Sequence, residues 1–138
     1  MFEECETYQV QLFKKLEKEI KEKIPFSRGS LTCFKEVVAH SVFDLDKGSI
    51  DVISNFGINL VEGEIKTTKE NYRKVKSEIE GIKTVGAWGY VARGCKVVEV
   101  HRHGDIYHVH FKCSLFLDSD QLVDVVKQIV KIVEKYGA

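Results

Sequence analysis

The sequence predicts a single α+β domain in which helices flank an antiparallel sheet, in the order helix, two or three strands, helix, three strands, helix. Its 138 residues suit one domain, and 43% hydrophobic with 30% charged residues is a globular composition. Apolar residues at helical spacing mark three segments, and alternating apolar and polar residues between turn signals mark strands. No linker interrupts this pattern, so the domain is expected to span residues 1–138.

The first half of the chain predicts one helix followed by a hairpin. The helix is expected from about Glu3 to Lys23 and must end before Pro25, because the residue preceding a proline is disfavoured in the α region. Residues 27–30 are interpreted as a loop. The Asp46-Lys47-Gly48 turn signal separates two strands, and the glycine-containing segment after them is either a third strand or irregular. The expected strands are 34–45, 49–53 and, with less regular alternation, 56–65.

The second half predicts a helix, a three-stranded meander and a last helix. Thr67 with Glu70 is a capping box, so the second helix is expected to begin there and to end at Gly81. Turns at 93–94 and 104–105 separate the strands. The last helix is expected from Asp118, and its wide apolar face predicts burial on the sheet, with an additional subunit contact left open. The expected meander strands are 85–92, 95–103 and 106–116.

Charge and composition narrow the functional classes. Lys plus Arg and Asp plus Glu both number 21, whereas nucleic-acid binders usually carry a strong basic excess. The acidic N-terminus has no signal-peptide pattern and no apolar run reaches membrane-spanning length, so a cytoplasmic protein without a membrane partner is expected. Abundant Lys, Glu, Ile and Val with a single Met point to a thermophile.

The four cysteines are scattered, at positions 5, 33, 95 and 113, without a C-x-x-C motif. The preferred interpretation is reduced thiols that act as small hydrophobic residues. A zinc site built from all four is the alternative.

One constellation of residues stands out in the hairpin around Gly104-Asp105. A tight turn there pairs His101 with His108, Glu99 with His110 and Val97 with Lys112. Val98 and Val100 then share the core face with Tyr107, Val109, Phe111 and Cys113. The opposite face carries Glu99, His101, His103, His108 and His110, because a one-residue slip would mix polar and apolar residues on both faces.

Directly opposed residues have Cβ atoms about 4.5–5.5 Å apart, so His101 and His108 could share zinc or another divalent transition metal, with His110 or Glu99 as further ligands. Such a site would suit a metal-binding protein or a metal-dependent hydrolase. The alternative, which we prefer, is a set of ordinary surface histidines. No G-x-S-x-G, P-loop or G-x-G-x-x-G motif is present, so no catalytic residue is assigned.

Trp88 and Tyr90 precede the hairpin and are expected on the same outer face, where exposed aromatic residues typically mark a protein contact. Stacking of single-stranded nucleic acid on these rings is a weaker alternative, which the zero net charge disfavours.

The predicted order of elements, with its hairpin through residues 43–50 (FDLDKGSI), resembles that of the roadblock family, and it is also similar to that of type III secretion chaperones. Both resemblances imply a small homodimeric scaffold that binds other proteins. The expected function is therefore a non-catalytic interaction domain that self-associates, and metal binding at the histidine face is the alternative.

Overall fold

The computed structural model describes residues 5–34, 38–55, 58–85, 91–116 and 119–138. Expectations for Glu3, Phe56, Trp88, Tyr90 and Asp118 lie outside these ranges. The described elements are α1 (Thr7–Lys21), β1 (Phe26–Phe34), β2 (Val38–Leu45), β3 (Gly48–Asn55), β4 (Ile58–Thr68), α2 (Tyr72–Glu80), β5 (Lys83–Val85), β6 (Val91–Arg93), β7 (Cys95–His103), β8 (Ile106–Phe116) and α3 (Ser119–Tyr136).

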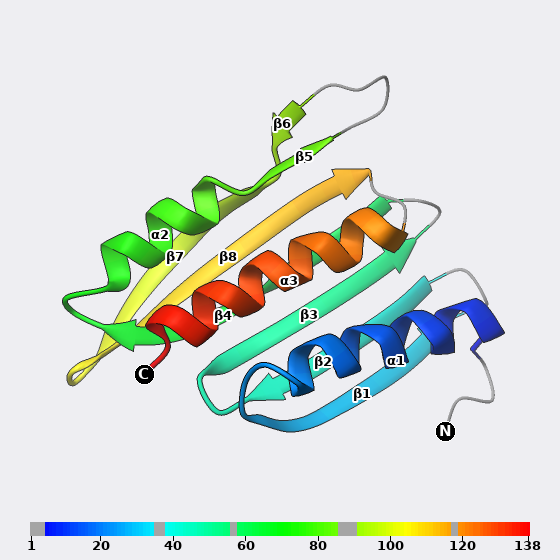
Figure 1. Cartoon of the computed structure of the whole chain (residues 1–138), viewed down its shortest axis with the longest axis horizontal. Coiled ribbons are helices and arrows are strands. Elements are labelled where there is room, and N and C mark those ends of the chain that lie inside the picture. Colours follow the sequence, from blue (N-terminus) through cyan, green and yellow to red (C-terminus); the bar gives the residue numbers. More distant parts are fainter. Residues whose placement is uncertain (1–4, 35–37, 56–57, 86–90, 117–118) are drawn as a thin grey trace.

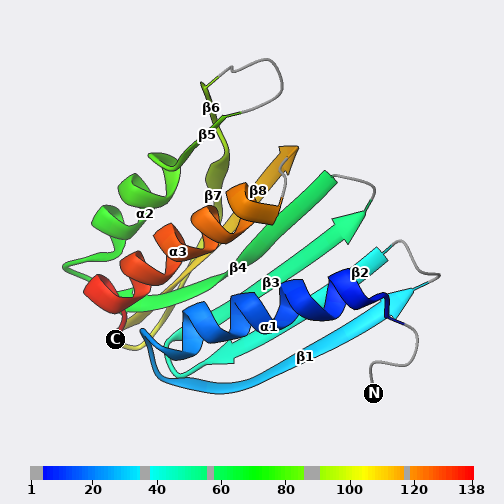
Figure 2. The same cartoon turned by 45° about the vertical axis from the view of Figure 1, so that its right-hand side comes forward.

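The predicted α+β class with an antiparallel sheet flanked by helices is confirmed. Six strands form one sheet in the order β1-β2-β3-β4-β8-β7, and every neighbouring pair is antiparallel. The three helices lie side by side on one face of this sheet (Figures 1 and 2). The other face carries no helix of the described chain, and we call it the outer face.

Two boundaries in the first half differ from the prediction. Residues 27–30 are not a loop but belong to β1, which pairs with β2 from Phe26 to Phe34 at the edge of the sheet. Thr67 does not begin α2. It continues β4 opposite Tyr107, and its hydroxyl donates a hydrogen bond to the Tyr136 carbonyl, 2.7 Å away. The helix begins at Tyr72 instead, after Asn71.

The predicted three-stranded meander is wrong in one strand. The β7–β8 hairpin is present, but the second neighbour of β8 is β4. Residues 83–85 and 91–93 instead pair with each other as a separate two-stranded sheet, β5–β6, which extends from one end of the molecule (Figure 1). Strand β7, beside which 85–92 was expected, is therefore an edge strand of the six-stranded sheet.

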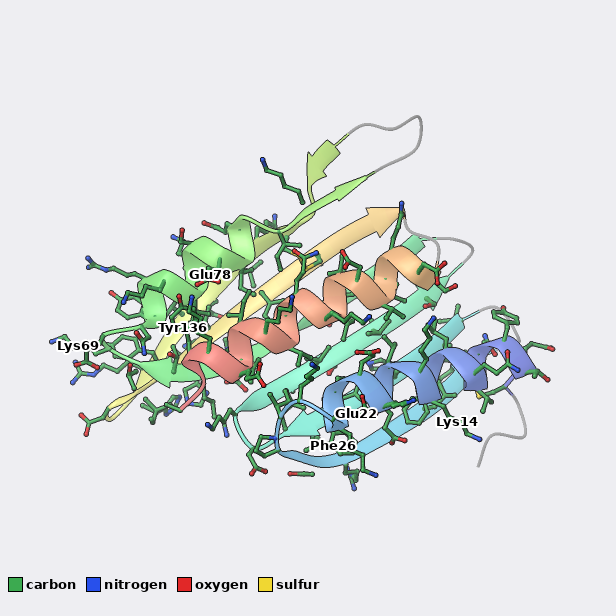
Figure 3. All side chains as sticks on the ribbon, viewed as in Figure 1. Lys14, Glu22, Phe26, Lys69, Glu78 and Tyr136 are labelled. Atoms are coloured by element: carbon green, nitrogen blue, oxygen red, sulfur yellow. A yellow bond between two sulfur atoms is a disulfide. The ribbon has the colours of Figure 1, made fainter. Side chains whose placement is uncertain are left out.

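The core lies between the helices and the inner face of the sheet. Phe43 and Phe111 are almost completely buried on β2 and β8. Helix α3 buries its whole apolar face within its own chain, so its width does not require a subunit contact. Beside it, Lys135 of α3 lies 4.0 Å from Glu78 of α2 (Figure 3). The buried residues of α3 are Leu122, Val123, Val125, Val126, Ile129, Val130, Ile132 and Val133.

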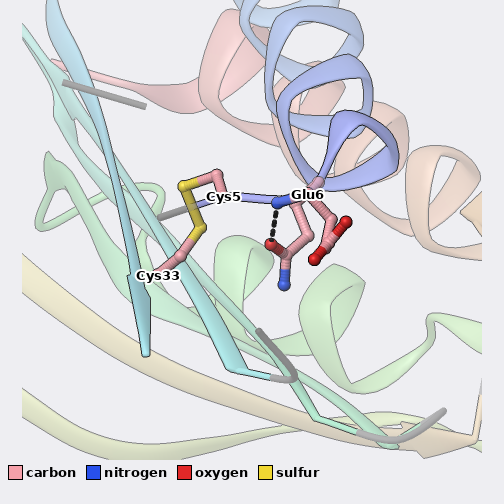
Figure 4. Close-up of a disulfide and its surroundings, with 4 residues drawn as sticks. Cys5, Glu6 and Cys33 are labelled. Atoms are coloured by element: carbon pink, nitrogen blue, oxygen red, sulfur yellow. Dashed lines mark hydrogen bonds between the residues drawn. A yellow bond between two sulfur atoms is a disulfide. The ribbon is translucent and has the colours of Figure 1, made fainter. Parts of the chain in front are cut away.

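All four cysteines are paired in disulfides, so the expectation of reduced thiols, and the alternative of a four-cysteine zinc site, are wrong for this structure. Cys5 joins Cys33, which ties the segment just before α1 to strand β1 (Figure 4). Cys95 joins Cys113 across the β7–β8 pair. Each bond encloses a loop of the unfolded chain, which reduces its conformational entropy and so stabilises the folded state.

Within the ranges that the structure describes, no helix combines the length and the apolar character needed to cross a lipid bilayer.

Candidate functional site

The outer face of the sheet collects ionisable side chains from all six of its strands. Buried residues alternate with half-exposed ones along β2, β3 and β4, so polar residues follow one another on the uncovered side. All five histidines of the chain lie there. The charged and histidine side chains of this face are Arg28, His40, Asp44, Asp51, Glu62, Glu64, Lys66, Lys96, Glu99, His101, His103, His108, His110 and Lys112.

The predicted pairing of the histidines in the β7–β8 hairpin is confirmed. His101 lies opposite His108, Glu99 opposite His110, and His103 opposite Ile106. Gly104 begins the turn with a φ of 63°, a conformation that favours glycine. The four histidines of this hairpin, His101, His103, His108 and His110, are called the histidine tetrad below.

The predicted pairing is wrong at the other end of the hairpin, because β7 contains a bulge between Val97 and Glu99. The extra residue places Val97 opposite Phe111 rather than Lys112. Val98 leaves the core face on which it was expected and is 53% exposed. A bulge inserts one unpaired residue into one strand, so all residues on its far side change register by one.

Within the tetrad, the rings contact each other in diagonal pairs. The centroids of His101 and His110 are 5.2 Å apart with an interplanar angle of 89°. Those of His103 and His108 are 4.9 Å apart at 71°. Both pairs are edge-to-face contacts, so the tetrad consists of two ring pairs, each of which spans β7 and β8.

Glu64 of β4 connects two members of the tetrad. Its Oε1 atom accepts a hydrogen bond from Nδ1 of His108 and lies 3.6 Å from Nε2 of His110. The His108 and Glu64 side chains are only 19% and 24% exposed, so this contact is shielded from water on several sides. At the edge of the sheet, Nε2 of His101 lies 3.1 Å from Oε1 of Glu99.

The sequence-predicted metal ligands His101, His108, His110 and Glu99 therefore share one face and one hairpin. Among the residues whose positions are described, however, no three His, Cys, Asp or Glu side chains converge on a common point suited to a metal. A shallow depression of about 340 Å³ lies next to the tetrad. It is lined by Asp51, Glu62, Glu64, His110 and Lys112, among other residues.

Asp51 and His40 form a further histidine–carboxylate contact on this face, with His40 Nε2 and Asp51 Oδ2 3.5 Å apart. Burial raises the pKa of the Asp51 carboxyl above its ordinary value of 3.8, Glu62 and Asp44 raise it further, and His40 acts in the opposite direction. Desolvation therefore outweighs the histidine contact at this position.

We expect Asp51→Asn to flatten the pH dependence of stability. Because the folded-state pKa is raised, folded Asp51 holds its proton at pH values where the unfolded chain has lost it. Ionisation of Asp51 then lowers the free energy of unfolding as the pH rises from about 4 through the folded-state pKa. Urea unfolding of both proteins between pH 3.5 and 7 measures this loss, which the variant should lack.

Asp105→Asn, in the exposed β7–β8 turn, is the control and should leave the pH profile unchanged. A loss of stability in Asp51→Asn that grows as the pH rises would mean that the His40 contact outweighs the burial of the carboxyl.

Sequence reasoning missed Glu64, His40 and Asp51 as members of the outer face. A signal for Glu64 was present, since Glu62 and Glu64 alternate with Val61, Gly63 and Ile65 as in a half-buried strand. Glu64 was not assigned to the outer face, because segment 56–65 was predicted only as either a strand or an irregular segment. The proposed partner-binding residues Trp88 and Tyr90 lie outside the described ranges.

Comparison with known proteins shows no family for this chain. No protein-family model matches the chain, and none of the curated proteins compared with it matches in sequence. Among solved structures, the chain is similar to the crystal structure of YbjN from E. coli, a proposed transcription regulator. The sequences are 8% identical, the TM-score is 0.40, and the match covers 91% of this chain and 89% of YbjN.

Proposed function

We propose that this chain is a non-catalytic protein-interaction domain that acts as a homodimer joined through the edge strand β7. The observation that carries the proposal is the exposure of this edge. Strand β7 is nine residues long and lies at the edge of the sheet. Two of its apolar side chains, Val98 and Val100, are 53% and 37% exposed. A long edge strand with exposed apolar side chains is a template for pairing with another strand.

The two ends of β7 are not equally open. At its start, the Val97 N–H donates to Oε2 of Glu80 in α2, at 3.4 Å, and the bulge follows directly. Bulges and charged side chains commonly protect the edge of a sheet against pairing with a strand of another chain. From Val98 to His103 every side chain is exposed, and this stretch is the proposed pairing segment.

A second copy of the chain fits this segment through the side chains that it would pair. A two-fold axis at Val100 places Val100 opposite the partner's Val100 and Glu99 opposite the partner's His101. The Glu99–His101 pair occurs twice because the axis repeats it. The two Val100 side chains would then meet on the inner face and a carboxylate would meet an imidazole on the outer face, and such cross-strand pairs stabilise a sheet.

A second protein is proposed to bind the segment between β5 and β6, which contains Trp88 and Tyr90. Aromatic side chains of this kind are enriched in protein interfaces. We also propose a cytoplasmic location. The two disulfides are compatible with it in a hyperthermophile, because the intracellular proteins of hyperthermophiles are rich in such bonds. The composition that indicated a thermophile agrees with this assignment.

Light scattering coupled to size-exclusion chromatography tests the dimer. The wild-type chain is expected to elute with the mass of two chains at micromolar concentration. Val100→Arg places two like charges opposite each other at the proposed axis, which costs several kcal/mol, so we expect dimerisation to weaken at least about 100-fold.

Tyr8→Arg is the matched control, because Tyr8 is 62% exposed on α1. This helix packs on β1 and β2, at the opposite edge of the sheet from β7. The substitution should leave the dimer intact. A wild-type protein that is monomeric at about 100 μM, or a Val100→Arg variant that remains dimeric, would contradict the proposal.

A further inference from the structure

We propose that the histidine tetrad binds one divalent transition-metal ion, such as Cu²⁺, Ni²⁺ or Zn²⁺, on the outer face of the sheet. Imidazole nitrogen suits all three ions. The tetrad supplies two histidines from each of two paired strands, so the hairpin register alone brings the four rings together. This inference does not depend on self-association through β7.

The spacing of the rings supports a shared ion. Two imidazoles that bind one tetrahedral ion with metal–nitrogen bonds of about 2.0–2.1 Å have centroids roughly 5 Å apart. The centroids of His101 and His110 are 5.2 Å apart, and those of His103 and His108 are 4.9 Å apart. Each of the two ring pairs therefore already lies at about the separation that a shared ion requires.

The orientation of the rings is the remaining step. The edge-to-face contacts leave no three ligand atoms converged among the described residues. His101 and His110 are 47% and 36% exposed, so their rings have space to rotate about the side-chain bonds. Binding then requires rotation of exposed side chains and no movement of the sheet.

Glu64 orients one ligand of the proposed site. A carboxylate oxygen accepts hydrogen bonds, so the Nδ1–H group of His108 donates a hydrogen bond to Oε1 of Glu64. Neutral His108 then carries a lone pair on Nε2, the atom that would bind the ion. A carboxylate behind a metal-binding histidine fixes the tautomer and raises the basicity of the ring. Glu64 thus has an orienting role, whereas Glu99 was the carboxylate expected from the sequence.

Calorimetric titration of the full, tag-free chain with CuCl₂, NiCl₂ and ZnCl₂ tests the site. We expect one ion per chain, with Cu²⁺ bound most tightly. His101→Ala and His108→Ala should abolish binding or weaken it severely. Glu64→Gln should weaken it about 10–100-fold, as the loss of an orienting carboxylate does in other metal sites. Circular dichroism confirms that each variant is folded.

His40→Ala is the matched control, since His40 lies on the same face but on β2, and it should leave the affinity unchanged. The absence of binding to all three ions would overturn the proposal, as would full binding by folded His101→Ala and His108→Ala. One ion per two chains would also overturn it. Failure here leaves the dimer untouched, because light scattering in the presence of a chelator tests the dimer alone.

Discussion

Phe43→Ala is expected to lower the free energy of unfolding by about 3–5 kcal/mol, the range for removal of a buried phenylalanine. Phe43 is fully buried on the inner face of β2. Its ring stacks on Phe13 of α1, with centroids 5.3 Å apart and an interplanar angle of 14°, and lies 6.4 Å from the ring of Phe26. The substitution leaves a cavity between helix and sheet and removes an aromatic contact of about 0.5–1.5 kcal/mol.

Denaturant unfolding measures this loss, which is a large part of the 5–15 kcal/mol typical of a domain. Phe34→Ala is the matched control, because Phe34 is 52% exposed on β1 and should cost less than about 1 kcal/mol. Phe43→Leu keeps most of the buried volume and should fall between the two, which preserves the test if Phe43→Ala does not fold. Equal losses at positions 34 and 43 would contradict the described core.

The features that were predictable from the sequence are those set by residues close together in the chain. The turns at Gly48 and Gly104 both have positive φ, and each joins strands that pair directly. The register of the histidines follows from the second of these turns alone. Local turn chemistry fixes which residues face each other in a hairpin, and burial of one face forbids a slip.

The features that were not predictable depend on contacts between distant segments. Strand β4 pairs with β8, about 50 residues later, and this pairing brings Glu64 to His108 and His110. It also overrides the helix-capping signal at Thr67, whose hydroxyl instead donates a hydrogen bond to the carbonyl of Tyr136 at the C-terminal end of α3. No local pattern identifies a strand's second neighbour, so the carboxylate at the centre of the site could not be assigned.

The bulge in β7 explains why the Cys95–Cys113 pair was not recognised from the hairpin register. In the regular hairpin register, Cys95 would lie opposite Ser114. The extra residue between Val97 and Glu99 shifts the start of β7 by one position, so Cys95 lies opposite Cys113, where the two side chains are bonded. Bulge and disulfide therefore support each other, because the covalent bond is compatible with the shifted register and not with the regular one.

Replacement of both Cys95 and Cys113 by alanine is expected to lower the free energy of unfolding by about 3 kcal/mol. The bond spans 18 residues, and closure of a 15-residue loop is worth about that amount in the chain-entropy model. The variant should also lose protection of the β7 amides against hydrogen exchange, since nothing else covalently opposes a return to the regular register. Urea unfolding and hydrogen exchange measure the two effects.

The matched control replaces Cys5 and Cys33, which are 28 residues apart, and should cost a few tenths of a kcal/mol more by the same model. This control frees the start of α1 but leaves β7 unchanged, so β7 protection relative to global stability should stay at the wild-type level. If both variants changed β7 exchange equally, the disulfide would act only on the unfolded chain, and its proposed role in holding the bulge would be wrong. A loss of β7 protection specific to the Cys95/Cys113 variant would instead show that this bond holds the edge strand in the register that exposes Val98.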